Sequence, residues 1–429
     1  MRRFAAALFI VVCLTAAVAS RAQAAGLWLY EQGTPDQGTA AAGRAALGKD
    51  ASTAWGNPAG MTRLDTTQLM LGAGAVVIQS EFETGPGTTK SGGGSDLTSV
   101  IPLLSGHFVY NVSRDFKLGA SLTSLMGGIF DYGDTYAGRY FIQREAIVTL
   151  AFTPVAAYRI TDWLSVGGGF SVVGGYLSGK MAINNPDPAL RDGRLELYSM
   201  TVGFGGNVGV MVEPWAGTRF GVTYRTPVNL TFHDVIQSTR GLGPGLTFIL
   251  NVLGQRLDVP RGSKVDLTLT NPQEVMFSAY HDVTDKLAVM ANFGWQNWQA
   301  FGHVGTTIHG DTTIEKTLSL HFNDTYHYAV GAQYRVAPPW LVSAGFAYDT
   351  SPVAQGRRNV MLPLDRQLRY AAGVQYDVAK DLTLGAAYTL IDGGSAPFNT
   401  ESGELRGNLV GHYKPNFIHA IGVNLNKKF

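Results

Sequence analysis

One short pattern recurs six times along the chain: an aromatic or apolar strand end, a short polar turn and a new strand. The turns lie roughly 40 to 70 residues apart, which leaves room between consecutive turns for two strands joined by a longer loop. Short turns therefore alternate with long loops, and aromatic residues flank the short ones. This arrangement is typical of a transmembrane β-barrel with tight periplasmic turns and aromatic girdles. The six segments are Tyr110–Gly119, Tyr158–Gly167, Met211–Gly217, His281–Leu287, Tyr334–Trp340 and Tyr376–Gly385.

From Gln68 onward the chain predicts fourteen strands. They start near residues 68, 103, 116, 146, 163, 194, 217, 264, 286, 323, 340, 366, 381 and 415. Fourteen antiparallel strands with both ends on the same side need six short turns, which is the number found. We therefore predict an all-β fold, a 14-stranded antiparallel transmembrane barrel over residues 67–429.

The last strand has the clearest period of two, which suits lipid on one side and a polar lumen on the other. The carboxyl-terminal Phe429 belongs to its apolar face and resembles the terminal aromatic residue by which the outer-membrane assembly machinery recognises its substrates. The apolar face is predicted to hold Phe417, His419, Ile421, Val423, Leu425 and Phe429, and the other face Ala420, Gly422, Asn424, Asn426 and Lys428.

Residues 1–24 are predicted to be a cleaved secretory signal peptide. Arg2 and Arg3 precede an apolar run from Phe4 to Val18, and Ala22-Gln-Ala24 forms a small-x-small cleavage signal. The run is short for a retained anchor helix, which is the alternative. The chain's one cysteine, Cys13, lies in this segment, so the mature chain is expected to hold no disulfide or thiolate metal site.

Composition narrows the possible functions. The signal segment holds three of the 33 basic residues and none of the 32 acidic ones, so the mature chain has no basic excess for binding nucleic acid. After residue 24 no stretch reaches the roughly 18 consecutive apolar residues of a helical span. A membrane location therefore requires a closed barrel, since only that or a helix satisfies every backbone group in lipid.

Two regions differ from the strand pattern. Residues 25–66 are rich in small residues and predict a compact amino-terminal segment with short helices. Residues 83–100 predict a flexible loop, and residues 236–262 hold the apolar stretch Leu242–Leu253. An apolar stretch in an exposed loop is either an interaction surface or a plug that packs on the barrel mouth.

The sequence contains none of the catalytic motifs considered. The sequence has no H-E-x-x-H, G-x-S-x-G, P-loop or C-x-x-C motif, and no histidine has a serine two residues later, as strand-borne lipase sites require. Glycine runs such as Gly167–Gly169 miss the phosphate-binding spacing. We expect no enzyme activity, no cofactor and no metal.

Several segments together resemble the FadL family of outer-membrane transporters for long-chain fatty acids and aromatic hydrocarbons. Asp50–Met61, centred on Asn57-Pro58-Ala59, looks like the hatch motif of that family. The other matching segments, in the family's order, are Tyr132–Ala137, Gly221–Arg225, Leu267–Glu274, Asp324–Tyr326 and Phe346–Val353. The resemblance covers nearly the whole mature chain.

The resemblance implies a barrel plugged by an amino-terminal hatch, here residues 25–66, that passively carries hydrophobic molecules. The ligand would pass from an external groove to an internal pocket and leave sideways at an inward kink of the third strand, which we place at Gly127 and Gly128. Glycines that only relieve crowding are the alternative there. A general porin or adhesin barrel is the alternative function.

The ligand site is the least defined feature. The loop over residues 183–192 is short, so one apolar loop remains to build an external groove, with Leu246, Phe248, Ile249, Leu250, Val252 and Leu253. A fatty acid needs a cation for its carboxylate, and Lys180 or Lys316 is the candidate, whereas a monoaromatic needs none. The partners expected are the hydrophobic ligand, membrane lipid and lipopolysaccharide, and the barrel-assembly machinery, with the protein a monomer in the outer membrane.

Overall fold

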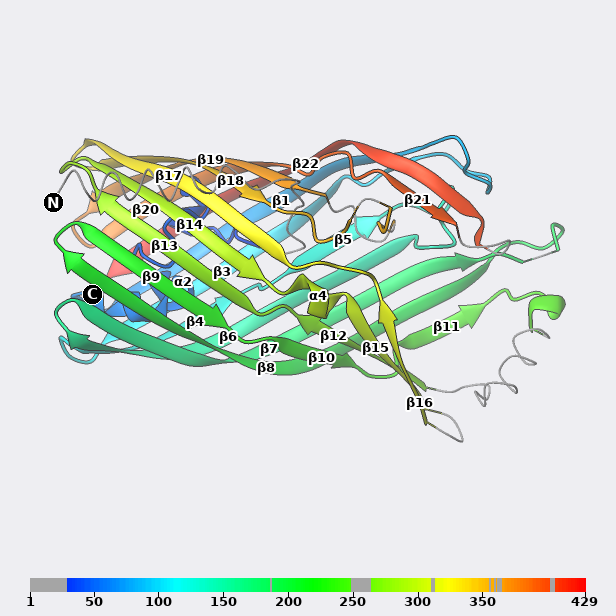
Figure 1. The fold of residues 1–429 in the computed structure, drawn as a ribbon, viewed down its shortest axis with the longest axis horizontal. Helices are drawn as coiled ribbons and strands as arrows, with labels where there is room; N and C mark the ends of the chain where they lie inside the picture. The colour runs from blue at the N-terminus through cyan, green and yellow to red at the C-terminus, as the bar shows by residue number, and fades with distance from the viewer. Residues whose placement is uncertain are drawn as a thin grey trace.

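The protein is a closed antiparallel barrel whose wall has fourteen strands (Figure 1). The computed structural model describes residues 29–185, 187–247, 264–309, 313–354, 356–358, 360, 365–401 and 406–429. Each wall strand pairs with the next along the chain, and the last pairs with the first over Gln68↔Lys428 to Thr84↔Gly411, which closes the barrel. The wall strands are β1 (Gln68–Thr84), β3 (Ser99–Asn111), β4 (Phe116–Thr123) with its continuation β5 (Gly127–Asp131), β6 (Arg144–Thr161), β7 (Leu164–Ile183), β8 (Gly193–Trp215), β9 (Thr218–Arg225), β13 (Glu274–Asp282), β14 (Leu287–Gln296), β17 (Thr325–Ala337), β18 (Trp340–Asp349), β19 (Gln367–Ala379), β20 (Leu382–Asp392) and β22 (Asn408–Lys428).

All six predicted short turns join neighbouring wall strands. They connect β3 to β4, β6 to β7, β8 to β9, β13 to β14, β17 to β18 and β19 to β20. The turns lie at one end of the barrel, together with the C-terminus (Figure 1). Exposed aromatic side chains flank them, as the sequence predicted: Tyr110, Phe116, Tyr158, Trp163, Trp215, Tyr334, Trp340 and Tyr376.

The alternation predicted for the last strand is confirmed in β22. Ile421, Val423 and Leu425 are exposed on the outer face, whereas Ala420, Asn424 and Asn426 are buried. Phe429 is 68% exposed, and its backbone N–H donates to the carbonyl of Thr67 at 2.9 Å. The outer face is thus apolar and the inner face polar, as a transmembrane barrel requires.

The prediction of a wall strand from residue 264 is wrong. β12 (Lys264–Asn271) leaves the wall and joins a separate sheet with β10 (Val228–Phe232), β15 (His303–His309) and β16 (Thr313–Ser319). The wall strand between β9 and β14 is instead β13, which begins at Glu274. Pro227 and Pro272 stand at the two breaks, one between β9 and β10 and the other between β12 and β13. A proline offers no N–H to a ladder. The chain therefore leaves the wall at both prolines, next to the last wall pair, Arg225 and Glu274.

The remaining short elements are β2 (Ser95–Asp96), β11 (Ile236–Arg240), a helical turn over residues 244–247, the helix α4 (Trp298–Phe301) between β14 and β15, and β21 (Phe398–Glu401). The loop predicted over residues 83–100 is shorter than expected, because β1 extends to Thr84 and β2 pairs with its end. Between β7 and β8 the connection is short, as predicted.

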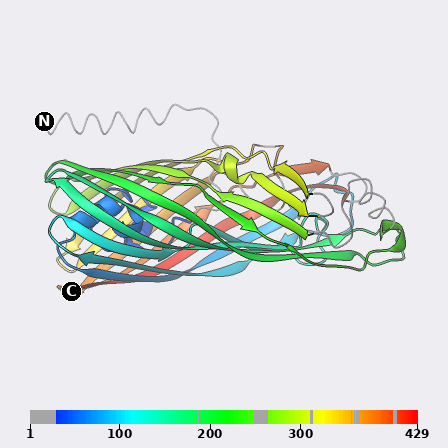
Figure 2. The same ribbon diagram turned by 90° about the horizontal axis from the view of Figure 1, so that it is seen from below.

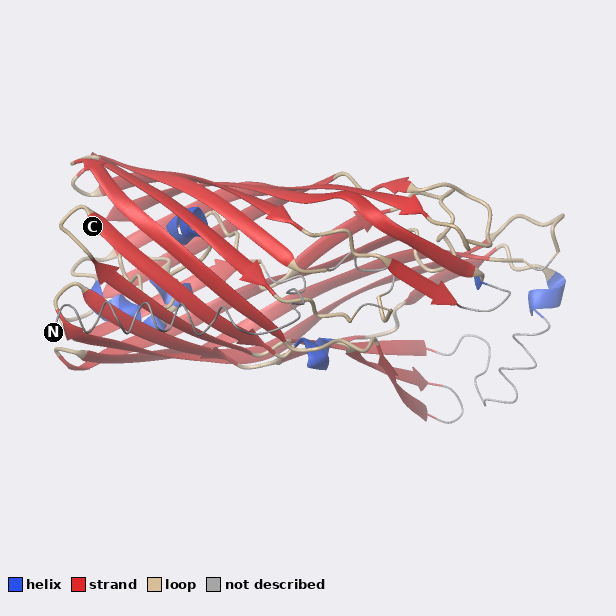
Figure 3. Cartoon of the chain, turned by 45° about the horizontal axis from the view of Figure 1, so that its top comes forward, coloured by secondary structure: helices blue, strands red, loops and turns tan. Residues whose placement is uncertain are grey.

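The amino-terminal segment forms short helices, as predicted. They are η1 (Pro35–Thr39), α2 (Thr53–Gly56) and η2 (Pro58–Arg63), and nearly every residue in them is buried. Figures 2 and 3 show the segment enclosed by wall strands near the end with the C-terminus. The predicted signal peptide, residues 1–24, lies outside the described residues. In the part of the chain that is described, no helix is both long enough and apolar enough to cross a membrane.

Candidate ligand-binding site

The third wall strand is interrupted. β4 ends at Thr123 and β5 starts at Gly127, and they appear as separate arrows in Figure 1. β4 pairs with β3 on one side and β6 on the other, but β5 forms a ladder with β6 alone. The upper part of β3, from Ser99 to Ser105, therefore pairs with β1 and has no ladder partner on its other side. One hydrogen bond spans this break, from the Ser99 hydroxyl to the Ile129 carbonyl at 3.2 Å.

The amino-terminal segment provides bonds where β3 does not. The Leu29 N–H donates to the Leu125 carbonyl at 3.4 Å, and the Gln32 amide donates to the Ser124 carbonyl at 3.0 Å. On the other side the Met126 carbonyl accepts from the Thr149 N–H. Because buried carbonyls need partners, Leu29 and Gln32 of the amino-terminal segment stabilise the interruption.

A cavity adjoins this break. Its volume, measured as the space open to the centres of water molecules, is about 70 Å³. Gly127 and Gly128, predicted to permit the kink, both line it. Its wall is mostly apolar and comes from the amino-terminal segment and from β1, β3, β5, β20 and β22: Leu29, Val76, Ile78, Ile101, Leu103, Phe130, Ile391 and Ile418. An apolar cavity with a few polar groups is the usual form of a small-molecule site.

The polar side of the cavity is built around Arg369 of β19, whose side chain is 2% exposed. Its Nη1 donates to Glu31 Oε1 and its Nε to Asp349 Oδ2, both at 2.6 Å. Its Nη2 donates to Gln367 Oε1 at 2.6 Å. His327 holds the other oxygen of Asp349 at 2.6 Å. All three nitrogens of the guanidinium thus have partners, which is how a buried charge is tolerated.

Asn57 of the predicted hatch motif is fully buried between the segment and the wall. Its amide donates to the carbonyl of Ala45 at 2.7 Å and to that of Val210 in β8 at 3.0 Å, and its Oδ1 accepts from the Ala59 N–H at 3.1 Å. Pro58 begins η2, where a missing N–H costs nothing.

Two wall residues that face this motif are glycines. Gly167 and Gly209 are paired across β7 and β8. A Cβ at Gly167 would lie 2.7 Å from the Ala59 nitrogen, and one at Gly209 would collide with the Asn57 side-chain oxygen. The close approach of segment and wall therefore requires glycine at this pair.

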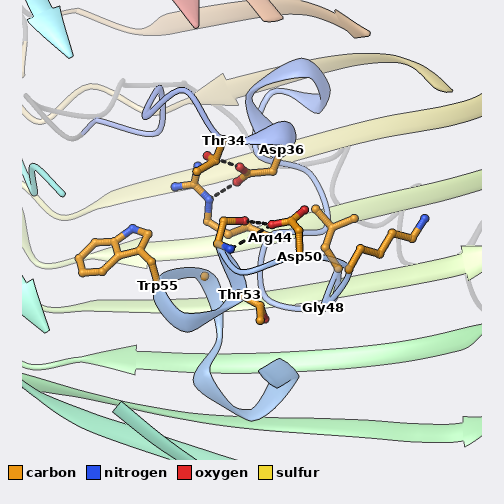
Figure 4. A pocket seen from close by; sticks show the side chains of 11 residues that line it. Thr34, Asp36, Arg44, Gly48, Asp50, Thr53 and Trp55 are labelled. Carbon is orange, nitrogen blue, oxygen red and sulfur yellow. Dashed lines mark hydrogen bonds and ion pairs between the residues drawn. The ribbon is translucent and has the colours of Figure 1, made fainter. Parts of the chain in front are cut away.

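A second, smaller cavity lies within the amino-terminal segment itself (Figure 4). Its lining combines polar residues, among them Thr34, Asp36, Arg44 and Asp50, with Leu47 and Trp55. Its volume of about 20 Å³ is enough for a water molecule and too small for a hydrophobic ligand. Burial alone would lower the pKa of Arg44, but its ion pair with Asp36 raises that pKa above the ordinary value. Burial also raises the pKa of the Asp50 carboxyl. We assign this cavity to the internal packing of the segment.

Neither predicted cation lines the cavity beside the break. Lys180, near the end of β7, forms an ion pair with Asp134 at 2.6 Å. Lys316 lies on β16 in the separate sheet and is exposed. Of the predicted groove residues, Leu246 is buried. Phe248, Ile249, Leu250, Val252 and Leu253 lie outside the described residues.

The sequence reasoning missed Arg369 and Glu31. The sequence contains one signal for Arg369. It lies two residues from the small residue Ala371, so both side chains point to the same face of β19, and its neighbours Leu368 and Tyr370 are apolar or aromatic. Alternation therefore places Arg369 on the inner face. No local signal identifies Glu31, because its pairing with Arg369 joins residues 338 positions apart. Across the described residues, no cluster of His, Cys, Asp or Glu is arranged to hold a metal ion.

A closed antiparallel barrel with an apolar outer band, exposed aromatic residues beside its short turns and a polar inner face belongs to the class of transmembrane β-barrels. The model of the family "Outer membrane protein transport protein (OMPP1/FadL/TodX)" matches residues 15–429. The chain therefore belongs to this family, as the sequence motifs indicated.

Individual relatives agree with this assignment. The chain is 28% identical over 407 residues to a long-chain fatty acid transport protein of Salmonella typhi, an alignment that covers 90% of this chain and 91% of the relative. The solved structure of a Pseudomonas aeruginosa FadL homologue has a TM-score of 0.81 at 20% identity and covers 94% of this chain and 100% of that one. The Ralstonia pickettii toluene transporter TbuX has a TM-score of 0.66 at 16% identity, with 94% and 99% coverage. Both structures show that the fold is shared.

Proposed function

We propose that the protein carries hydrophobic small molecules, either long-chain fatty acids or related hydrocarbons, passively across the outer membrane. The observation that carries this proposal is the apolar cavity beside the interrupted third strand. Membership of the family and the names of the relatives, a fatty acid transport protein and a toluene transporter, support the same substrate class. They favour a transporter over an enzyme.

The proposed route leads from outside to the cavity and then sideways, between the upper part of β3 and β5, into lipid. A hydrophobic ligand that leaves the cavity in this way never returns to water, which avoids the free-energy cost of hydrating its apolar surface. Support comes from the weak pairing of β3 with β5, for which the described residues show one hydrogen bond, and from Gly127 and Gly128, which line the cavity at the same place.

The amino-terminal segment, residues 25–66, is proposed to be the hatch. Asn57 and the glycine pair beneath it tie the segment to the inner wall, and Leu29 and Gln32 tie it to the strand break. A segment held at both places obstructs a wet lumen, which argues against a general porin.

The cellular setting follows from the class of protein. We propose that residues 1–24 are removed on export, that the assembly machinery inserts the barrel by recognising Phe429, and that the mature chain works as a monomer surrounded by lipid and lipopolysaccharide. The exposed apolar band and the position of Phe429 at the end of β22 support this.

The test compares uptake of a radiolabelled long-chain fatty acid and of toluene by cells with and without the protein. Faster entry of at least one of them, with unchanged entry of a hydrophilic sugar, is the expected result. Equal uptake of both hydrophobic compounds by the two strains would refute the proposal.

A further inference from the structure

The charges around the cavity bear on which hydrophobic molecules it admits. Arg369 is a cation that lines the cavity, and its guanidinium is already paired with carboxylates of the protein. Glu31 and Asp349 each accept a 2.6 Å hydrogen bond from it. One positive charge thus meets two negative ones, all nearly inaccessible to water. Glu31 lines the cavity but Asp349 does not; the second lining carboxylate is Asp365, which is paired with Arg358 at 2.6 Å.

Glu31 differs from Asp349 in its origin. Asp349 belongs to β18 and is also held by His327, so it is a fixed part of the wall. Glu31 belongs to the amino-terminal segment and lines the cavity, and Arg369 is its ion-pair partner. A carboxylate that came from a ligand would make the same bond to the same nitrogen.

We propose that Glu31 is a specificity-determining residue whose carboxylate holds, on Arg369, the position that a ligand carboxylate would need. With Glu31 in place, the cavity offers an apolar wall and a net negative polar side, which favours uncharged apolar ligands. An ionised fatty acid has to displace Glu31 or lie beside it, and like charges repel strongly where water is excluded. This inference rests on the proposed function, because it names the ligands of the same cavity.

The test uses the purified full-length protein with its natural processing and two probes of equal chain length, 1-octanol and octanoate, at pH 8. The substitution Glu31→Gln keeps the size of the side chain and its ability to accept from Arg369 while removing one negative charge. Octanoate should then bind about tenfold more tightly, which corresponds to about 1.4 kcal/mol, and octanol should change less than about twofold. Glu213→Gln is the matched control: Glu213 pairs with Arg63 of the same segment but does not line the cavity, so neither probe should respond.

The wild-type protein provides a second measurement that needs no variant: octanol should bind at least tenfold more tightly than octanoate. Equal affinities in the wild type would overturn the inference, and so would a Glu31→Gln variant in which octanoate gains no more than octanol does. If neither probe binds the wild type, the cavity is not a ligand site and the proposed function fails with it. Octanol binding without charge discrimination refutes this inference alone.

Discussion

Replacing Asn57 with alanine tests how the amino-terminal segment is held in the barrel. The fully buried Asn57 side chain donates to two carbonyls, those of Ala45 and Val210, and accepts from the Ala59 N–H. Alanine makes none of these bonds. Val210 is paired within the β7–β8 ladder. The Ala45 carbonyl and the Ala59 N–H are therefore the two groups left without a hydrogen-bond partner in the variant.

The magnitude follows from these two groups. A buried polar group left without a partner costs about 1–3 kcal/mol. Two such groups should weaken attachment of the segment by about 2–6 kcal/mol, which raises its detached population about 30- to 20,000-fold. The barrel wall keeps all of its ladders, so the variant should still fold.

The assay is entry of a small hydrophilic dye into cells, with heat-modifiable mobility on gels as the measure of barrel folding. Dye should enter the Asn57→Ala strain faster than the wild type. Asn399→Ala, the same change at an exposed position on β21, is the matched control and should have no effect. Unchanged dye entry in the Asn57→Ala strain, with normal barrel assembly, would refute the reasoning.

Three further predictions concern assembly, the wall and the exit. Deletion of Phe429 should lower the yield of heat-modifiable barrel more than deletion of Gly93 in the loop after β1, and equal yields would contradict a role of Phe429 in insertion. Gly209→Val should raise dye entry as Asn57→Ala does, because its side chain would collide with Asn57, and wild-type impermeability would show that the segment packs differently. The Gly127→Val/Gly128→Val variant should reach the surface and bind ligand but fail to deliver it, since β-branched residues favour a straight, paired strand, and normal uptake would place the exit elsewhere.

Features encoded by local patterns could be read from the sequence. The six short turns, the aromatic residues beside them and the two faces of β22 were all predicted, because each depends on a period of two or on a few adjacent residues. The short helices of the amino-terminal segment were predicted from its small residues.

Features that depend on distant partners could not. β12 alternates like a wall strand, and Pro272 marks its end, but the sequence does not show that the strand before this proline leaves the wall together with β10. The third strand breaks at residues 124–126, just before the predicted Gly127, and the bonds that hold this break come from Leu29 and Gln32, about 90 residues away. Arg369 acquires its role only when Glu31 and Asp349 converge on it. Lys180 and Lys316, the cations that the sequence predicts, lie outside the cavity, whereas the buried cation Arg369 lies on the inner face of β19.

Exit of the ligand through the break between β3 and β5 is tested most directly by a reversible covalent bridge across that break. The Ser99 hydroxyl donates across the break to the Ile129 backbone carbonyl at 3.2 Å, so the bridge is introduced between these two positions as a Ser99→Cys/Ile129→Cys pair. Loss of free thiols in the oxidised protein shows that the disulfide has formed. The one natural cysteine lies in the predicted signal peptide, so no other thiol competes in the mature chain. Uptake of the hydrophobic substrate should fall in the oxidised double variant, return after reduction and stay normal in each single variant. Wild-type uptake through the fully bridged barrel would contradict the lateral route.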